Sequence, residues 1–82
     1  MNTNIELGMR VRYLREQKKM TLEDLAFESN MNKNYLSDLE RGNRNPTVKI
    51  LTRIAEALEV TLEELFKGIR TYWGPFLFIY FI

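Results

Sequence analysis

The sequence predicts a compact all-α domain of five helices that is followed by a short apolar C-terminal tail. Apolar residues recur at helical spacing from residue 5 to residue 67, and capping residues and glycine interrupt this periodicity at short intervals. A chain of 82 residues holds one domain and lies near the lower size limit for a self-sufficient core. We therefore expect dimerisation to add to its stability.

The first two helices are predicted from amphipathic spacing and from a capping residue. Leu7, Val11 and Leu14 recur at positions i, i+4 and i+7, which gives the first helix an apolar face. Thr21 can cap a second helix over residues 22–29, because its hydroxyl can accept a backbone amide of the first turn. Acidic residues directly after Thr21 suit the positive end of the helix dipole.

A short turn separates the second helix from the third. Asn30 tolerates a left-handed conformation, and Asn32 can cap the helix that follows. The third helix is predicted over about residues 33–41, and Gly42 is a typical C-terminal stop. Residues 42–46 then form a polar loop.

The fourth and fifth helices each begin at a threonine. Thr47 is the expected cap of the fourth helix, and Asn45 followed by Pro46 in the first turn is an alternative. Residues 61–64 match a capping box for a short fifth helix. The expected buried positions are Leu51, Ile54, Ala55 and Leu58 in the fourth helix, and Leu62, Leu65, Phe66 and Ile69 in the fifth.

Composition argues against catalysis. The chain contains no His and no Cys, which removes zinc fingers, thiolate nucleophiles and Ser-His-Asp arrangements. No convergent carboxylates or lysines replace them, so we expect no enzyme activity, no metal site and no cofactor. The net charge of +1 conceals a blocked distribution, because residues 1–19 and 31–53 each carry five basic and two acidic residues. One basic block therefore contains the third helix.

The second and third helices have the arrangement that places the second helix of a pair in the DNA major groove. At 100° per residue, one arc of about 140° holds the polar residues of the third helix. These are Lys33, Asn34, Ser37, Asp38 and Arg41, and they lie opposite Tyr35, Leu36 and Leu39. Lys33 suits guanine, Asn34 suits adenine, and Asp38 suits the amino group of cytosine. Outward polar residues are also usual on any surface helix, so this pattern alone leaves both interpretations open.

Six short motifs follow one another along residues 7–66. They are Leu14-Arg15, Met20-Thr21, Glu23-Asp24-Leu25-Ala26, Tyr35-Leu36-Ser37-Asp38-Leu39-Glu40-Arg41-Gly42, Asn45-Pro46 and Ala55-Glu56-Ala57-Leu58. In this order and with these gaps, the segment resembles the lambda-repressor-like helix-turn-helix family, which includes phage repressors, Cro proteins and Xre-type regulators. Within that family, residues 32–35 and 37–44 look most like controller proteins of restriction–modification systems.

The resemblance implies a role for individual residues. The positions that it places against base edges are Lys33, Asn34, Ser37 and Asp38. Those that it places against the DNA backbone are Thr21, Tyr35, Asn43, Arg44 and Lys49, which agrees with the anion binding expected at helix N-termini. Arg15 and Glu40 match a pair that joins the first helix to the third.

The resemblance also implies a homodimer on two half-sites about one helical turn apart. Leu62, Leu65, Phe66 and Ile69 are the expected interface. Burial inside a five-helix core is the alternative, and both can hold for different faces of one short helix.

The tail falls outside the family pattern. Residues 76–82 are all apolar or aromatic, and Gly74-Pro75 prevents a continuous helix into them. The run spans about 23 Å as a strand or about 10 Å as a helix, so it does not cross a bilayer of ~30 Å. Three alternatives remain: burial across the dimer with Trp73, Phe76 and Phe78 in the interface, packing against its own subunit, or a membrane-surface tether or accidental read-through sequence.

Together these features predict a helix-turn-helix domain over residues 1–69 and an apolar extension over residues 70–82. The expected function is that of a sequence-specific transcription regulator, a repressor or a controller, that binds a palindromic double-stranded DNA operator as a homodimer. An antitoxin-like protein that binds a partner protein through its tail and autoregulates its operon is the alternative. We expect a cytoplasmic, nucleoid-associated protein of bacterial or phage origin.

Overall fold

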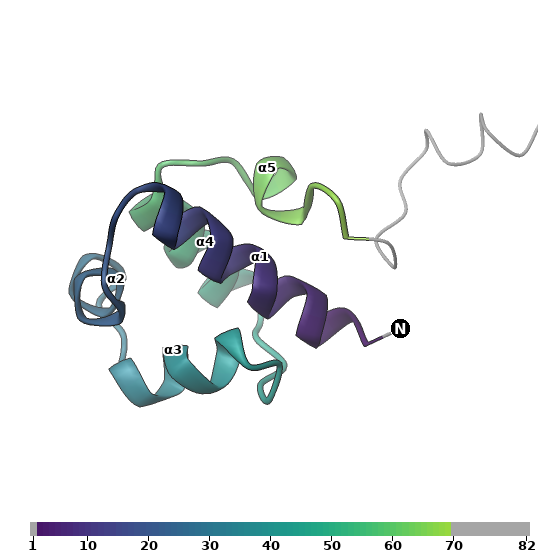
Figure 1. The fold of residues 1–82 in the computed structure, drawn as a ribbon, viewed down its shortest axis with the longest axis horizontal. Coiled ribbons are helices and arrows are strands. Elements are labelled where there is room, and N and C mark those ends of the chain that lie inside the picture. The colour runs from purple at the N-terminus through teal and green to yellow at the C-terminus, as the bar shows by residue number, and fades with distance from the viewer. Residues whose placement is uncertain (1, 70–82) are drawn as a thin grey trace, which may run out of the picture.

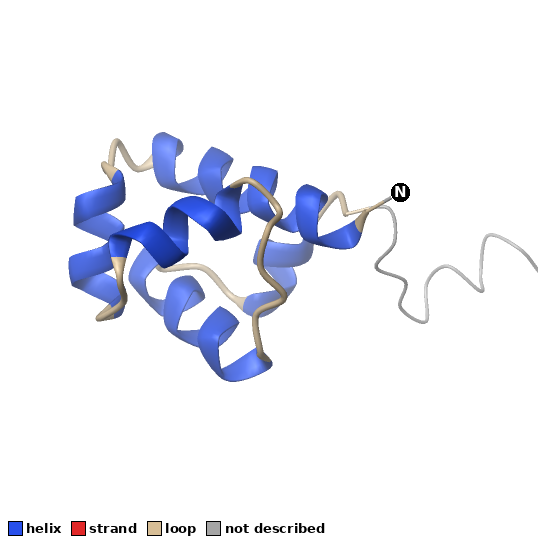
Figure 2. Cartoon of the chain, turned by 90° about the horizontal axis from the view of Figure 1, so that it is seen from below, coloured by secondary structure: helices blue, strands red, loops and turns tan. Residues whose placement is uncertain are grey.

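The computed structural model describes residues 2–69, and these form the predicted all-α arrangement. The helices of this part are α1 (Thr3–Gln17), α2 (Leu22–Ser29), α3 (Lys33–Glu40), α4 (Val48–Leu58) and α5 (Leu62–Phe66). In Figure 1, α1 crosses in front of α4, with α3 below it and α5 above it. Figure 2 is seen from below and brings α3 to the front. No helix among residues 2–69 has the length and hydropathy that a membrane span needs.

Short polar side chains begin all five helices of residues 2–69. Asn2, Thr21, Asn32, Thr47 and Thr61 have extended backbones and accept first-turn amides, as the capping rules predict. At α2 the capping box is reciprocal, because the Thr21 hydroxyl accepts the Asp24 amide at 3.0 Å and the Asp24 carboxylate accepts the Thr21 amide at 2.9 Å. Thr47, and not Asn45, is therefore the cap of α4.

Residues with positive φ end or follow several helices. Asn30 (φ +54°) and Gly42 (φ +83°) occupy the left-handed region where the sequence predicted a turn and a stop. Lys19 and Glu59 also have positive φ, at +58° and +59°, although neither residue type favours this region. The third helix ends at Glu40, one residue earlier than predicted, with Arg41 as its C-cap.

The hydrophobic core takes residues from all five helices. Its buried members are Leu7, Val11, Leu25, Ala26, Leu36, Leu39, Leu51, Ile54, Ala55, Leu58, Leu65 and Ile69. The predicted face of α1 is correct for Leu7 and Val11, and Leu14 is partly buried against the same cluster. This core packs α1 against α3 and α5, and α2 against α3 and α4.

Two residues expected at a dimer interface lie instead inside the subunit. Leu65 is 0% exposed and Ile69 is 5% exposed, because α5 turns this face onto α1 and α4. Leu62 and Phe66 are half-buried at the edge of the core. The alternative of internal burial therefore holds for Leu65 and Ile69. Trp73, Phe76 and Phe78, which were also predicted at the interface, lie outside the described residues.

Gly8 allows α1 to approach α3 closely. A Cβ atom added at Gly8 would lie 2.4 Å from the Leu39 carbonyl oxygen and 2.5 Å from the Glu40 carbonyl oxygen. Real Cβ atoms do not come this close to backbone oxygens, so a larger residue would push the two helices apart. The absence of a side chain at one position of α1 thus sets the position of α3.

Candidate nucleic-acid interface

The turn between α2 and α3 is fixed from both sides. The Met31 amide donates to the Ala26 carbonyl at 2.9 Å, which closes the C-terminal end of α2. From α4, the Arg53 guanidinium donates to the Ser29 carbonyl at 2.9 Å and also to the Asn30 carbonyl. A cation on these C-terminal carbonyls is favourable for the helix dipole. Arg53 therefore fixes the turn that sets the angle between α2 and α3, and sequence periodicity gave no sign of this role.

The outward face of α3 carries the side chains that the sequence predicted for base reading. Lys33 and Asn34 are exposed, whereas Ser37 and Asp38 are half-buried one turn further along. Leu36 and Leu39 are buried on the opposite side. The structure thus brings the four predicted side chains to one face of the helix, at the outer edge of the domain.

An acidic residue of α2 holds the first of these side chains. The Lys33 ammonium donates to the Glu23 carboxylate at 2.6 Å, and both side chains are more than half exposed. This hydrogen bond to Lys33 lowers the pKa of Glu23 below its usual value. The Lys33 ammonium keeps two further N–H donors, which a base can accept while the contact with Glu23 persists.

Asp38 organises the basic side chains at the other end of α3. Its carboxylate accepts from Arg41 at 2.5 Å and from Arg44 at 3.3 Å. Arg41 also donates to the Ser37 hydroxyl at 2.8 Å, and the Arg44 guanidinium lies 5.3 Å from the centre of the Tyr35 ring. Asp38 lies on the predicted face, but its carboxylate is already paired, so its contacts favour positioning of two arginines over direct pairing with cytosine.

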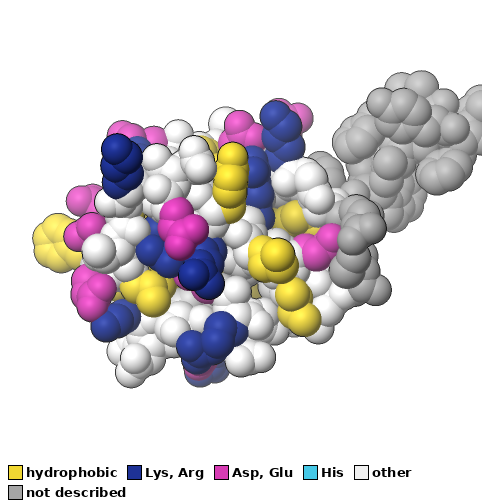
Figure 3. Space-filling view, in the orientation of Figure 1, with side chains coloured by type: hydrophobic (Ala, Val, Ile, Leu, Met, Phe, Trp, Pro, Cys, Tyr) yellow, Lys and Arg dark blue, Asp and Glu magenta, His cyan; other side chains and the backbone are white. Residues whose placement is uncertain are grey.

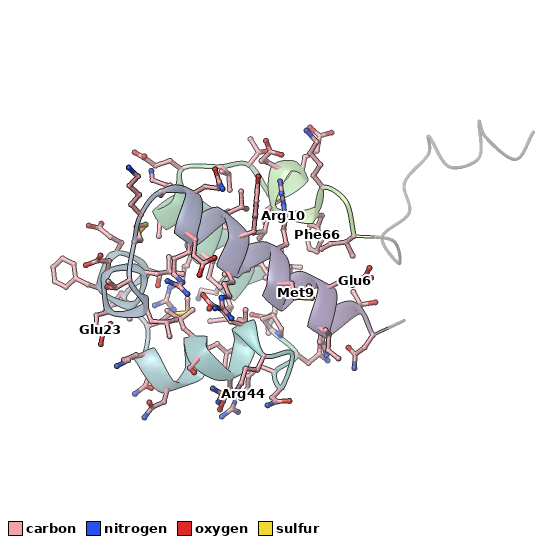
Figure 4. The ribbon with its side chains drawn as sticks, viewed as in Figure 1. Glu6, Met9, Arg10, Glu23, Arg44 and Phe66 are labelled. Carbon is pink, nitrogen blue, oxygen red and sulfur yellow. The ribbon has the colours of Figure 1, made fainter. Side chains whose placement is uncertain are left out.

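The residues predicted to contact the DNA backbone lie on both sides of α3. Asn43, Arg44 and Lys49 are exposed in the loop after α3 and in the first turn of α4, and Figure 4 shows Arg44 beside the C-terminal part of α3. Thr21 lies at the start of α2, where the capping box already uses the amides of Thr21 and Asp24. A phosphate contact at this helix terminus would have to use other groups of the first turn.

A buried ion pair joins α1 to α3. Arg15 Nε donates to Glu40 Oε2 at 2.7 Å, and Arg15 Nη2 donates to Glu40 Oε1 at 3.0 Å. The third arm of the guanidinium donates to the Met20 carbonyl at 2.8 Å. The side chains are only 11% and 7% exposed, and the hydrogen bond to Glu40 raises the pKa of Arg15. The pair therefore ties α3 to α1 and to the loop before α2.

Several basic residues do not contribute to the surface charge of α3. Arg15 and Arg53 point inward, as described above, and Arg10 on α1 donates to the Glu64 carbonyl at 2.8 Å and to the Glu64 carboxylate at 3.0 Å. Lys33, Arg41, Arg44 and Lys49 remain exposed. Among residues 2–69, no group of three or more acidic side chains could hold a metal ion. The charge of the surface around α3 is therefore set by these four exposed basic side chains, and not by the net charge of +1 of the whole chain.

Comparisons with known proteins agree with this architecture. Residues 11–65 match the helix-turn-helix family HTH_3. Control protein C.BamHI of Bacillus amyloliquefaciens is 41% identical over 68 residues, which cover 79% of this chain and 84% of that protein. The HTH-type transcriptional regulator DdrOP3 of Deinococcus deserti is 35% identical over 68 residues. That match covers 83% of this chain and 53% of the regulator, so the chain spans about half the length of that relative.

A solved structure with DNA is also similar. C.Esp1396I bound to a 19 base pair DNA duplex superposes with a TM-score of 0.77 at 35% sequence identity. The match covers 84% of this chain and 92% of that chain.

Proposed function

Since this chain belongs to the helix-turn-helix family HTH_3, we propose that it is a DNA-binding transcription regulator that recognises a palindromic operator as a homodimer, with α3 in the major groove. The observation that carries the proposal is the outward face of α3, where exposed Lys33 and Asn34 precede an arginine network held by Asp38. Residues at the N-terminal end of such a helix are those that reach base edges. The likeness to C.BamHI favours a controller-type regulator over an antitoxin-like partner-binding protein.

In this proposal, base reading and positioning are divided between two ends of α3. Lys33 and Asn34 read bases, and Ser37 lies close enough to the same edge to contribute. Arg44 is held by Asp38 and by the Tyr35 ring, which directs it toward a phosphate. Asn43 and Lys49 are exposed in the loop after α3 and in the first turn of α4, and in this proposal they add further backbone contacts.

The proposed dimer uses the part of α5 that the core leaves accessible. Leu62 and Phe66 are half-buried, whereas Leu65 between them is in the core. An isologous contact through this edge would pair two α5 helices around a two-fold axis. The two α3 helices would then meet successive major grooves, about 34 Å apart.

Asn34→Ala tests base reading directly. We expect it to lose roughly 1–3 kcal/mol on the preferred operator and to lose discrimination at one position of each half-site, because the amide no longer pairs with a base. Competition binding against operators altered at single positions measures this. Asn43→Ala is the matched control, since the same change in the loop should weaken all operators alike. An unchanged preference in Asn34→Ala would remove this residue from the reading face.

Arg44→Ala tests the backbone contact. The variant should bind every duplex more weakly, and the slope of log affinity against log salt should flatten by about one unit, because one phosphate contact is lost. Arg12→Ala is a suitable control, since Arg12 is an exposed arginine of α1 that pairs with Glu16. A slope equal to that of the unaltered protein would show that Arg44 does not contact phosphate.

A further inference from the structure

α1 carries an exposed apolar stripe that the DNA-binding surface does not use. Ile5, Met9 and Tyr13 are spaced four residues apart and are 45%, 64% and 52% exposed. Because residues at i, i+4 and i+8 share one helix face, the three side chains form a continuous row about 12 Å long. Figure 3 shows apolar side chains in a diagonal row across the front of the molecule, over α1, and Figure 4 labels Met9 there.

The stripe is bordered by charged residues on both sides. Arg12 and Glu16 form an ion pair along one edge. On the other edge the Arg10 guanidinium lies 5.5 Å from the centre of the Tyr13 ring and pairs with Glu64 of α5. Such an apolar strip with a polar rim fits an uncharged apolar segment better than a charged one. It lies on α1, whereas the reading side chains lie on α3 below it, so an occupant would not compete with DNA (Figure 4).

The sequence supplies a segment with this chemistry. Residues 76–82 are apolar or aromatic without exception and contain no charged side chain. In Figures 1 and 2 the last described residues lie on the same side of the domain as the N-terminal end of α1. Six residues, 70–75, connect Ile69 to the segment and can span up to about 20 Å. The segment itself spans about 10 Å as a helix or about 23 Å as a strand, so either form can cover the stripe.

We propose that residues 76–82 dock on the Ile5–Met9–Tyr13 stripe of the same chain. The short connection over residues 70–75 favours the stripe of the same chain over the stripe of a second copy. A tether of this length gives the stripe of its own chain an effective concentration in the millimolar range, about a thousandfold above the micromolar concentration of an unassociated chain, and a reach of at most about 20 Å from Ile69 favours that stripe over the stripe of a dimer partner. Docking removes two apolar surfaces from water at once, and it shields a β-prone segment that would otherwise promote aggregation.

Cross-linking tests the contact and its partner together. Because the chain has no Cys, Met9→Cys with Ile79→Cys introduces two unique thiols into the full chain. At micromolar protein, a short bis-maleimide should join them within one chain at least tenfold faster than in the control pair Val48→Cys with Ile79→Cys. Val48 is an equally apolar residue on α4 that is 69% exposed. Products are separated by mass as intrachain bridges or covalent dimers.

Each possible outcome of the cross-linking either supports or contradicts docking on the same chain. A dominant covalent dimer would show that the segment docks on the second copy, and equal rates in both pairs would show that it does not dock on the stripe.

Met9→Asp provides an independent check without cysteines. It should increase the rate of chymotrypsin cleavage after Phe76, Phe78 and Tyr80 at least fivefold, whereas Val48→Asp should leave that rate unchanged. Equal cleavage rates in the two variants would overturn the proposal.

Discussion

Glu40→Ala is expected to destabilise the domain by about 3–5 kcal/mol, the cost of leaving one partner of a buried ion pair without its counter-charge. Arg15 would keep its bond to the Met20 carbonyl but would lose both carboxylate contacts at 2.7 and 3.0 Å. A guanidinium with an 11% exposed side chain cannot recover this loss from water. Urea unfolding followed by circular dichroism measures the change in the free energy of unfolding.

Two further variants distinguish the loss of the pair from the loss of a side chain. Glu16→Ala removes a carboxylate from the exposed pair with Arg12 and should change stability by about 0.5 kcal/mol or less. Replacing both buried partners, Arg15→Met with Glu40→Leu, should recover most of the stability, since no buried charge is left unpaired. If Glu40→Ala were as mild as Glu16→Ala, Arg15–Glu40 would not be the tie between α1 and α3.

Gly8→Ala should destabilise the domain and displace α3. Alanine gains about 1 kcal/mol of helix propensity over glycine inside a helix. This gain is opposed by a steric clash, because the Cβ atom of alanine would lie 2.4 Å from the Leu39 carbonyl oxygen. That oxygen belongs to the backbone and cannot rotate away. Forced separation of packed elements typically costs 1–3 kcal/mol or more. We therefore expect a net loss of up to about 2 kcal/mol, together with weaker operator binding because α3 carries the proposed reading residues.

Gly68→Ala is the control for this prediction. Gly68 has φ +83° and no atom within 4 Å of an added Cβ, so its replacement has only a conformational cost of about 1 kcal/mol. That variant should bind the operator with unchanged specificity. A Gly8→Ala protein that is as stable as the unaltered chain would show that α1 and α3 are not held at this distance by Gly8.

Features that depend on near neighbours in the chain could be predicted from the sequence. Thr21, Asn32 and Thr47 cap the predicted helices because their short side chains reach amides two or three residues away. The apolar spacing identified Leu36 and Leu39 as the packed side of α3, and hence the side that faces outward. These are local rules, and here they were sufficient for the helices and for the side of α3 that faces outward.

Contacts between distant parts of the chain were not predictable in this way. The bond from Arg53 to the Ser29 carbonyl joins residues 24 positions apart, and Lys33 pairs with Glu23 across the turn. In both cases the sequence shows only a charged residue on a helix, and the partner depends on the packing of two helices. Leu65 and Ile69 are another example, because an apolar helix face has the same pattern whether it faces its own core or a second subunit.

The pairing of Asp38 was closer to being predictable. Ser37 and Asp38 lie four and three residues before Arg41, which is the spacing of neighbours on one helix face. That spacing identifies a local network. It does not reveal that Arg44, beyond the helix, joins the same carboxylate.

Selection of bound sites from random duplexes tests most directly whether α3 reads a palindromic operator. The unaltered protein should enrich two inverted half-sites with centres about 10 base pairs apart, one for each α3 of a dimer. The Asn34→Ala protein should enrich the same palindrome with one pair of symmetric positions no longer specified. Failure of the unaltered protein to enrich any sequence, or an identical preference in both proteins, would contradict recognition through this face.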